Sequence, residues 1–427
     1  MTTSAVEASN VQRAAGLRRF KPYPAYKDSG VEWLGEIPAG WEVKRLKFVA
    51  PARMGKLDKK PDDAVYVGLE HVESWTGRLL LDSQPESVDS VVAAFRAGDV
   101  LFGKLRPYLA KTARPDFDGV CTSEILPLRP SIDSYRSYVM YGLLNAPYIR
   151  WLNSLTNGTK MPRVSPEQVG SSFLTVPPEP DQRAIAAFLD RATARIDGLV
   201  AKKERLIELL QEKRTALITR AVTKGLDPNV PMKDSGVEWL GEIPAGWEVK
   251  HLRWAIMFQR GHDLPTDERE DGQIPVVTSS GISSTHSRAV AKAPGIVTGR
   301  YGTIGHFHLI TQDYWPLNTT LYSIDLRGND PRFLRHMLEH LSPLFLLNAV
   351  KSAVPGVDRN DIHPTATAVP PFPEQLRIAD FLDARNAEIA SLVAKVREAI
   401  ERLKELRTAL ISAAVTGKID VREEVTI

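Results

Sequence analysis

The sequence predicts an α+β protein with a pseudo-twofold internal duplication, in which two mixed α/β domains are separated by two long antiparallel coiled-coil helices. The 18 letters KDSGVEWLGEIPAGWEVK at 27–44 recur unchanged at 233–250. Further along, VPPEPDQRAIAAFLD at 176–190 aligns with VPPFPEQLRIADFLD at 369–383. Such self-similarity indicates that one structural plan occurs twice. Each half is therefore expected to contain a leading segment, a mixed domain and a long helix.

The two helices are predicted from apolar residues at alternating spacings of four and three, the pattern of a coiled-coil seam. Because neither helix would be stable alone with such a stripe exposed, they are expected to pack against each other. The seam positions are Ile185, Leu189, Ala192, Ile196, Leu199, Leu206, Leu210 and Leu217, and then Ile378, Leu382, Ile389, Leu392, Val396, Leu403, Leu406 and Leu410.

The expected divisions of the chain are a flexible tail over 1–20, a mixed domain over 21–180, a central helix over 181–226, a second mixed domain over 227–373 and a C-terminal helix over 374–427.

Within the mixed domains, short apolar runs bounded by turn residues predict strands. These runs are 64–69 and 98–103 in the first half, and 295–299 and 320–326 in the second. One helix is expected in each half, around 134–152 and 330–350. The tryptophans of the leading segments, Trp33, Trp41, Trp239 and Trp247, are expected to fasten those segments to a core.

Bulk composition limits the class of protein. A chain of 427 residues with 43% hydrophobic and 25% charged residues is typical of a soluble protein with two to four domains. The single cysteine, Cys121, excludes an intrachain disulfide and a cysteine-rich zinc site. Since no apolar run of about 18 residues and no signal-peptide pattern is present, we expect a cytoplasmic protein without membrane association.

Charge is segregated inside the mixed domains. Residues 100–115 carry four basic side chains and no acid, and residues 272–312 contain no Asp or Glu. A second, similar loop recurs later in each half, at 158–165 and 351–360. Basic, aromatic and small polar residues in such loops suit a surface that follows a DNA backbone and reads base edges, although a solvated loop surface fits the composition equally well. The candidate DNA-binding residues are Lys104, Arg106, Tyr108, Lys111, Lys160 and Arg163 in the first half, and Arg288, Arg300, Tyr301, Thr303, Lys351 and Arg359 in the second.

No catalytic or metal-binding residue is assigned. The chain lacks a phosphate-binding GxxxxGK[ST] loop and a serine nucleophile elbow. One motif, His336-Met-Leu-Glu339-His340, has the HxxEH spacing of inverted zinc proteases. The matching helix of the first half has no histidine, and no third ligand is evident, so a zinc hydrolase is the less favoured hypothesis.

The repeated motifs, in their order, resemble those of the specificity subunits of Type I restriction-modification systems. The resemblance rests on the two leading segments, on GDVLFGKLRPYLAKTA with the downstream CTSEILPLRP, and on the endings PPEPDQRAIAAFLD and PPFPEQLRIADFLD. It extends from about residue 21 through both halves. It implies two target-recognition domains, each reading one half of an asymmetric, two-part DNA site. It also implies that the two helices set the length of the unread spacer between the half-sites.

The resemblance further implies the partners of the chain. These are double-stranded DNA, two methylation subunits and the restriction subunits that join them. Binding of S-adenosylmethionine, ATP and Mg is expected on those partners, with no cofactor in this chain and no catalysis by it. A stand-alone DNA-binding regulator and a coiled-coil scaffold without a DNA role are the remaining alternatives.

Overall fold

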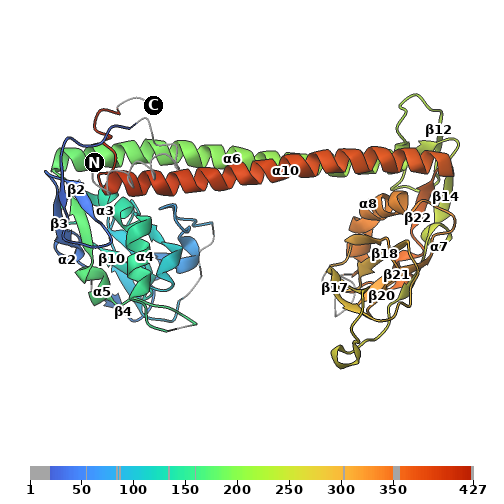
Figure 1. The fold of residues 1–427 in the computed structure, drawn as a ribbon, viewed down its shortest axis with the longest axis horizontal. Coiled ribbons are helices and arrows are strands. Elements are labelled where there is room, and N and C mark those ends of the chain that lie inside the picture. The colour runs from blue at the N-terminus through green and yellow to red at the C-terminus, as the bar shows by residue number, and fades with distance from the viewer. Residues whose placement is uncertain are drawn as a thin grey trace. The chain divides into compact units, whose positions relative to one another are not determined.

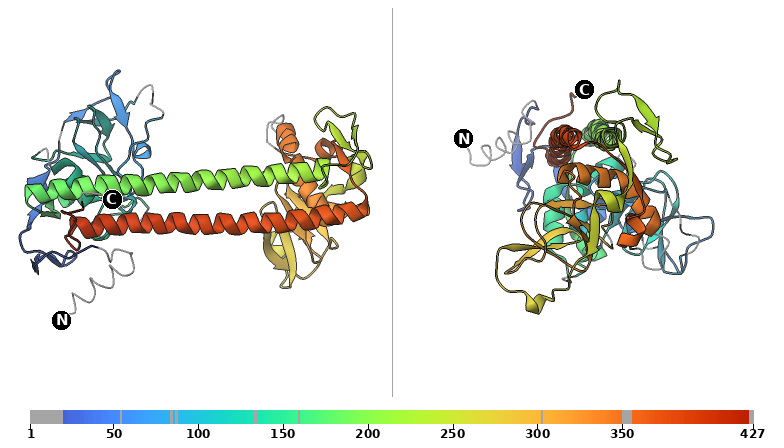
Figure 2. Two further views of the ribbon diagram at one scale, coloured as in Figure 1. Left: turned by 90° about the horizontal axis from the view of Figure 1, so that it is seen from above. Right: turned by 90° about the vertical axis from the view of Figure 1, so that its right-hand side faces the viewer.

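The computed structural model describes residues 20–424, apart from 54, 83–84, 86–87, 133–134, 159, 302 and 350–355. The chain forms two compact units: unit 1 comprises residues 1–203 and 397–427, and unit 2 comprises residues 204–396. Two long helices, α6 (Glu179–Lys224) and α10 (Phe372–Val415), pass from one unit into the other. Each unit therefore contains one segment of both helices, and within each unit the two segments lie side by side (Figures 1 and 2).

Unit 1 carries a mixed domain built from short strands. A hairpin pairs β1 (Tyr26–Asp28) with β2 (Glu36–Pro38), and β3 (Glu42–Arg45) pairs antiparallel with β11 (Phe173–Val176). One sheet has the order β4-β6-β9-β5, with the bounds Lys56–Leu57, Val92–Phe95, Gly119–Thr122 and Val65–Val67. The other has the order β10-β7-β8, with the bounds Ile125–Leu128, Val100–Gly103 and Thr112–Ala113.

The helices of this domain differ from the prediction at one place. The described ones are α2 (Leu46–Val49), α3 (Tyr135–Leu143), α4 (Ala146–Ser154) and α5 (Pro166–Ser171), with 3-10 turns η1 (Leu69–His71) and η2 (Pro107–Leu109). The single helix predicted over 134–152 is wrong, because the chain breaks between α3 and α4. Pro147 lies in the first turn of α4, where its missing N–H has no helical partner to lose, whereas the same proline inside one continuous helix would remove a hydrogen bond.

Unit 2 repeats this plan. The hairpin is β12 (Met232–Asp234) with β13 (Glu242–Pro244), and β14 (Glu248–His251) pairs antiparallel with β22 (Ala366–Val369). Its sheets have the orders β15-β21-β18-β19 (Met257–Arg260, Thr320–Asp325, Gly295–Gly299, Phe307–Ile310) and β17-β16-β20 (Gly281–His286, Ile274–Thr278, Trp315–Pro316). The described helices are α7 (Leu252–Ala255), α8 (Pro331–Ala349) and α9 (Arg359–Ile362), with the 3-10 turn η3 (Thr266–Glu268). The helix predicted over 330–350 is thereby confirmed.

Each unit has its own main core. In unit 1, large buried side chains such as Phe102, Tyr148 and Phe188 pack with Leu410 and Ile419 from the last segment of the chain. In unit 2, buried residues of α8 pack against Leu382 of α10. Burial of such aromatic and aliphatic surface is the main stabilising contribution to both units. The predicted class, a mixed α/β plan that occurs twice together with two long helices, is confirmed.

The identical leading segments fasten to helix ends in both units. Trp41 and Trp247 are fully buried. Each lies against a left-handed glycine that follows a long helix: Gly417 after α10 and Gly225 after α6. A Cβ at Gly417 would lie 2.3 Å from Pro38, so only glycine fits that helix end. For Trp239 the prediction of burial is wrong, because 41% of this side chain is exposed.

The predicted seam of the long helices is only partly correct. Ile185, Leu189, Ile196 and Leu210 are buried, as expected. The prediction is wrong at Leu199, Leu206 and Leu392, which are exposed, whereas the buried face passes through Thr193 and Ile400 instead. A helix with 3.6 residues per turn drifts from a strict seven-residue frame. Each helix segment also packs on its own mixed domain. The buried face therefore departs from the predicted positions.

Among the described residues, no helix combines the length and the apolar character that crossing a membrane would require.

Candidate nucleic-acid interface

The first predicted loop of unit 1 is held in a strained conformation. It follows β7 and is closed at its base by the hydrogen bond from Gly103 N–H to the Lys111 carbonyl at 2.8 Å. Between these ends, Arg106 and Ala110 flank η2 with φ angles of 51° and 46°. Left-handed backbone at residues other than glycine costs on the order of 1–3 kcal/mol each and occurs most often where function requires it. The loop is therefore a candidate functional element on conformation as well as on charge.

The second predicted loop of unit 1 is fixed to the first. The Arg106 N–H donates to the Pro162 carbonyl at 2.7 Å, and the Val164 N–H donates to the Lys104 carbonyl at 3.1 Å. An isolated bridge also joins Leu105 to Arg163. The two basic segments, which are more than 50 residues apart in the sequence, thus form one surface of unit 1.

The candidate side chains of this surface divide into two groups. Arg106, Tyr108, Lys160 and Arg163 are exposed, and the Arg163 guanidinium lies 2.8 Å from Glu124. Lys104 and Lys111 are half-buried, and for both of them burial lowers the pKa of the ammonium group. Lys111 Nζ donates to the carbonyls of Leu69 and Val72 at 2.6 and 2.8 Å, so this side chain braces the loop from within.

Unit 2 brings its two predicted loops together in the same way. The Val357 N–H donates to the Arg300 carbonyl at 2.9 Å, and the Arg300 guanidinium lies 3.8 Å from Asp358. A Cβ at Gly356 would lie 2.5 Å from the Tyr301 ring, which shows how closely the second loop approaches the first. Each unit therefore joins the loop after a central strand, β7 or β18, to the loop before a short helix, α5 or α9.

The candidate side chains of unit 2 also divide into an exposed group and a largely buried or internally bonded group. Arg288, Tyr301 and Arg359 are exposed, whereas Arg300 is largely buried, with its guanidinium 5.2 Å from the Tyr301 ring centroid. Thr303 Oγ1 donates to the Ser279 carbonyl at 2.6 Å and shapes the loop. Lys351 lies outside the described residues.

The HxxEH motif has a structural role. His336 is buried, and its Nε2 lies 2.9 Å from Asp383 of α10. Glu339 forms an ion pair with Arg214 of α6 at 2.6 Å, and His340 Nδ1 lies 3.1 Å from Thr219 Oγ1. Within the described part of the chain, no group of three or more His, Cys, Asp or Glu side chains could hold a metal ion. These residues fasten α8 to the long helices, and the zinc-hydrolase hypothesis is not supported.

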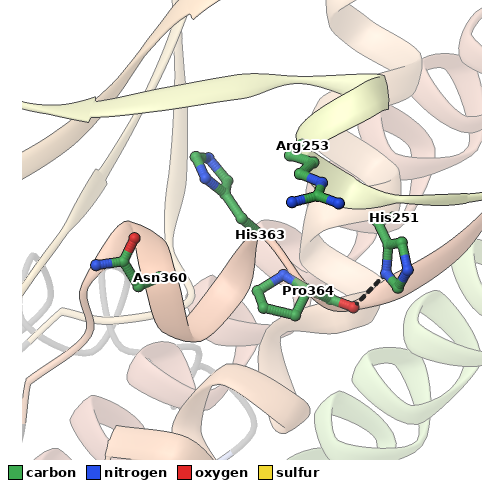
Figure 3. A pocket seen from close by; sticks show the side chains of 5 residues that line it. All are labelled: His251, Arg253, Asn360, His363 and Pro364. Carbon is green, nitrogen blue, oxygen red and sulfur yellow. Dashed lines mark hydrogen bonds between the residues drawn. The ribbon is translucent and has the colours of Figure 1, made fainter.

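Sequence reasoning missed a small pocket beside the second loop of unit 2. It has a volume of about 220 Å³ and is lined by His251, Arg253, Asn360, His363 and Pro364 (Figure 3). His251 ends β14 and Arg253 lies on α7, whereas the other three come from α9 and the residues after it (Figure 3). The available signal was positional, because His251 and Arg253 directly follow the second copy of the 18-letter repeat.

Comparison with known proteins shows similarity to one family. A family model described as the Type I restriction modification DNA specificity domain matches residues 244–402. The putative type I restriction enzyme MjaX specificity subunit of Methanocaldococcus jannaschii is 22% identical over 426 residues, covering 91% of this chain and 96% of the relative. The chain is thus similar to Type I specificity subunits over most of its length, as the repeated motifs predicted.

Other specificity subunits match over different lengths. The EcoDI specificity subunit of Escherichia coli is 25% identical over 209 residues, 45% of this chain and 46% of that subunit. The fold of this chain is also similar to that of a solved chain from work described as the structural basis underlying complex assembly and conformational transition of the type I R-M system. The TM-score is 0.69 at 19% identity, over 89% of this chain and 98% of that one.

Proposed function

We propose that this chain is a Type I specificity subunit that recognises an asymmetric, two-part sequence in double-stranded DNA, with each unit reading one half-site. One observation carries the proposal: in both units, a basic loop after a central strand is hydrogen-bonded to a second basic loop before a short helix. Basic side chains position a protein on phosphates, and neighbouring side chains can then read base edges in the grooves. Because the two loop pairs differ in sequence, two different half-sites are expected.

The proposed contacts follow from exposure. Arg106, Tyr108, Lys160 and Arg163 would meet DNA from unit 1. In unit 2, the corresponding exposed residues are Arg288, Tyr301 and Arg359. Lys351, which lies outside the described residues, is proposed as a contact from its charge alone. Arg300 would act mainly by holding Tyr301 in place. Lys104, Lys111 and Thr303 are proposed to support the loops.

The partners are proposed to be two methylation subunits, which restriction subunits join to form the complete enzyme. The repeat supports two like partners, since the same 18 letters occur on a hairpin beside a helix end in both units. S-adenosylmethionine, ATP and Mg would be bound by those partners. A stand-alone regulator would bind DNA tightly without them, and no observation favours that alternative.

The primary test is a methylation map. The chain would be expressed with its cognate methylation subunit in a host without other methylases, and the genome would be read by long-read sequencing. A split motif with methylated adenines in both halves, lost when this chain is omitted, is the expected result. A soluble complex that methylates no motif would contradict the proposal.

Two variants then test the assignment of half-sites and spacer. Exchange of residues 45–175 for the equivalent segment of another specificity subunit should change one half-site only. Insertion of seven residues into α6 after Glu204 and into α10 after Val396 lengthens both helices by about 10 Å, or about three base pairs of DNA. The spacer should widen while both half-sites stay the same, and an unchanged spacer would refute a role of the helices in setting it.

A further inference from the structure

The four residues that follow each identical segment form a matching surface feature in both units. They are Arg45-Leu-Lys-Phe48 in unit 1 and His251-Leu-Arg-Trp254 in unit 2. In each case the third residue is a cation on a short helix and the fourth is a highly exposed aromatic. Phe48 is 68% exposed and Trp254 is 57% exposed. One exposed aromatic side chain needs no explanation, but here the same arrangement occurs at equivalent positions of both units.

In both pairs the cation lies over the ring. Lys47 Nζ is 5.2 Å from the Phe48 centroid, and Arg253 Cζ is 5.4 Å from the Trp254 centroid. Within the described residues, neither cation has a carboxylate at ion-pair distance. The ring restricts the motion of the cation without neutralising it. Each pair thus presents a positioned positive charge to an outside partner.

Each pair is also fixed to the segment that begins with the second basic loop. In unit 1, the Leu46 N–H donates to the Ser172 carbonyl at 2.8 Å, directly after α5. In unit 2, the Leu252 N–H donates to the Thr365 carbonyl at 2.8 Å, shortly after α9. The cation–aromatic pairs therefore belong to the same structural piece as the proposed DNA-reading loops.

The pocket of unit 2 shows which ligand chemistry this feature suits. None of its lining residues is a carboxylate. His363 Nε2 accepts a hydrogen bond from the Phe258 N–H at 3.0 Å, so in the neutral ring the proton sits on Nδ1, which remains a donor. His251 Nδ1 donates to the Pro364 carbonyl, and Asn360 is exposed. Burial lowers the pKa of His363, which leaves Arg253 as the permanent cation of the pocket.

The size of the pocket excludes a large ligand. At about 220 Å³ it is smaller than the roughly 300–1,000 Å³ of pockets that enclose cofactors or drug-sized molecules. One cation among neutral donors in such a space suits a single anionic group. A phosphate of a nucleic-acid backbone meets this requirement.

The repetition of the feature favours DNA over a protein partner. Phosphate contacts carry no sequence information, so a duplicated chain that reads two different half-sites can keep them alike while its base-reading loops diverge. A protein interface would instead need a contiguous desolvated centre depleted in charge. Here each exposed ring is paired with a charge.

We propose that Lys47–Phe48 and Arg253–Trp254 are two matching phosphate-contact sites, one in each unit, which hold the DNA backbone beside the base-reading loops without reading sequence. This inference rests on the proposed function, since it requires that both units bind DNA.

The test is the salt dependence of DNA binding by the complex of this chain with its methylation subunit. Lys47→Ala, Arg253→Ala and the double variant would be compared with wild type on a duplex carrying the methylated motif and on an unrelated duplex. Each single variant should weaken binding to both duplexes on the order of tenfold. Each should also reduce the slope of log K against log salt by about 0.9, and the double variant by about twice that.

The controls separate charge from folding. Arg253→Lys should retain the wild-type slope, and Arg377→Ala, which removes an exposed guanidinium of α10 outside the pocket, should leave slope and affinity unchanged. Unaltered binding by the double variant would refute the phosphate sites while leaving the proposed function intact. Loss of the methylation subunit from the purified complex would refute them too, because the pairs would then bind protein. Absence of DNA binding by wild type would refute the proposed function itself.

Discussion

The two units place the same helix residues in different chemical surroundings. Asp190 and Asp383 end the two copies of the FLD motif, and Arg407 and Arg214 begin the two copies of RTALI. In unit 1, Asp190 accepts a hydrogen bond from the Tyr141 hydroxyl at 2.7 Å. In unit 2, Asp383 lies 2.9 Å from His336 and 2.8 Å from Arg335. The duplication kept the residues of the long helices, whereas each mixed domain evolved its own partner for them.

The two equivalent arginines, Arg407 and Arg214, differ in burial and in partners. Arg407 of unit 1 is 7% exposed and donates to Asp197, to the Trp75 carbonyl at 2.7 Å and to the Thr76 carbonyl at 2.6 Å. Arg214 of unit 2 is 41% exposed and binds Glu339. Unit 1 therefore depends on one buried guanidinium, and unit 2 on a network of ion pairs around α8. Identical residues in a repeat therefore need not contribute equally to the stability of the two units.

The largest expected effect comes from Arg407→Met. Trp75 has a φ of 67°, so the buried guanidinium holds a strained turn as well as the partly buried carboxylate of Asp197. Loss of one partner of a buried pair costs about 3–5 kcal/mol. Hydrogen exchange of the full chain should report this loss in peptides of unit 1. Arg214→Met should cost about 1 kcal/mol or less in unit 2, because that arginine is well exposed. Equal losses would refute the difference between the units.

A smaller effect is expected from Asp383→Asn. The amide oxygen can still accept a hydrogen bond but carries no charge to pair with the arginines of α8, so the local stability of that helix should fall by about 1.5–3 kcal/mol. Asp190→Asn is the matched control, since the Tyr141 hydroxyl can donate equally to an amide oxygen, and it should cost less than about 1 kcal/mol. Urea dependence of hydrogen exchange in α8 and α3 would measure both. If Asp190→Asn lowered local stability as much as Asp383→Asn, the charge of Asp383 would add no stability to α8.

The smallest expected effect is on pH dependence. Burial lowers the pKa of His340 and His363, both in unit 2. A group with a lowered folded pKa binds more protons when unfolded, so its contribution is complete above the unfolded value of about 6.5 and is lost as pH falls below it. Hydrogen exchange corrected for intrinsic rates should show unit 2 weakening between pH 7.5 and 5.5. His340→Gln should reduce this dependence, and an unchanged profile would contradict the role of that histidine.

Much of the fold could be predicted because the relevant signals are local. Strands such as 295–299 stand out as apolar runs between turns, and the end of α10 is marked by Gly417. Which residues of the long helices are buried could not be predicted fully. Contacts with the mixed domain, as well as spacing along the helix, decide that Thr193 is buried and Leu199 is exposed. The break before α4 was signalled by Pro147 and overlooked.

The candidate interface was predicted as two separate basic segments in each half. Their junction depends on backbone hydrogen bonds such as that from Arg106 to Pro162, whose partners are far apart in sequence. Separation in sequence also explains why the structural role of the HxxEH motif could not be predicted. Asp383, the partner of His336, is 47 residues away along the chain. Charge and composition indicate which loops are candidates for binding DNA, but only the fold shows that Lys111 donates to carbonyls within unit 1.

The last segment of the chain completes the first unit. Tyr138 donates to the Val415 carbonyl, Tyr26 donates to the Gly417 carbonyl, and Lys21 bridges to Asp420. Unit 2, in contrast, is one continuous stretch. During synthesis at about 5–20 residues per second, the earliest residues to leave the ribosome must therefore wait for the latest before their core can close. The unit translated second can fold first, and the half-formed first unit is the stage at which a newly made chain is most exposed to chaperones and proteases.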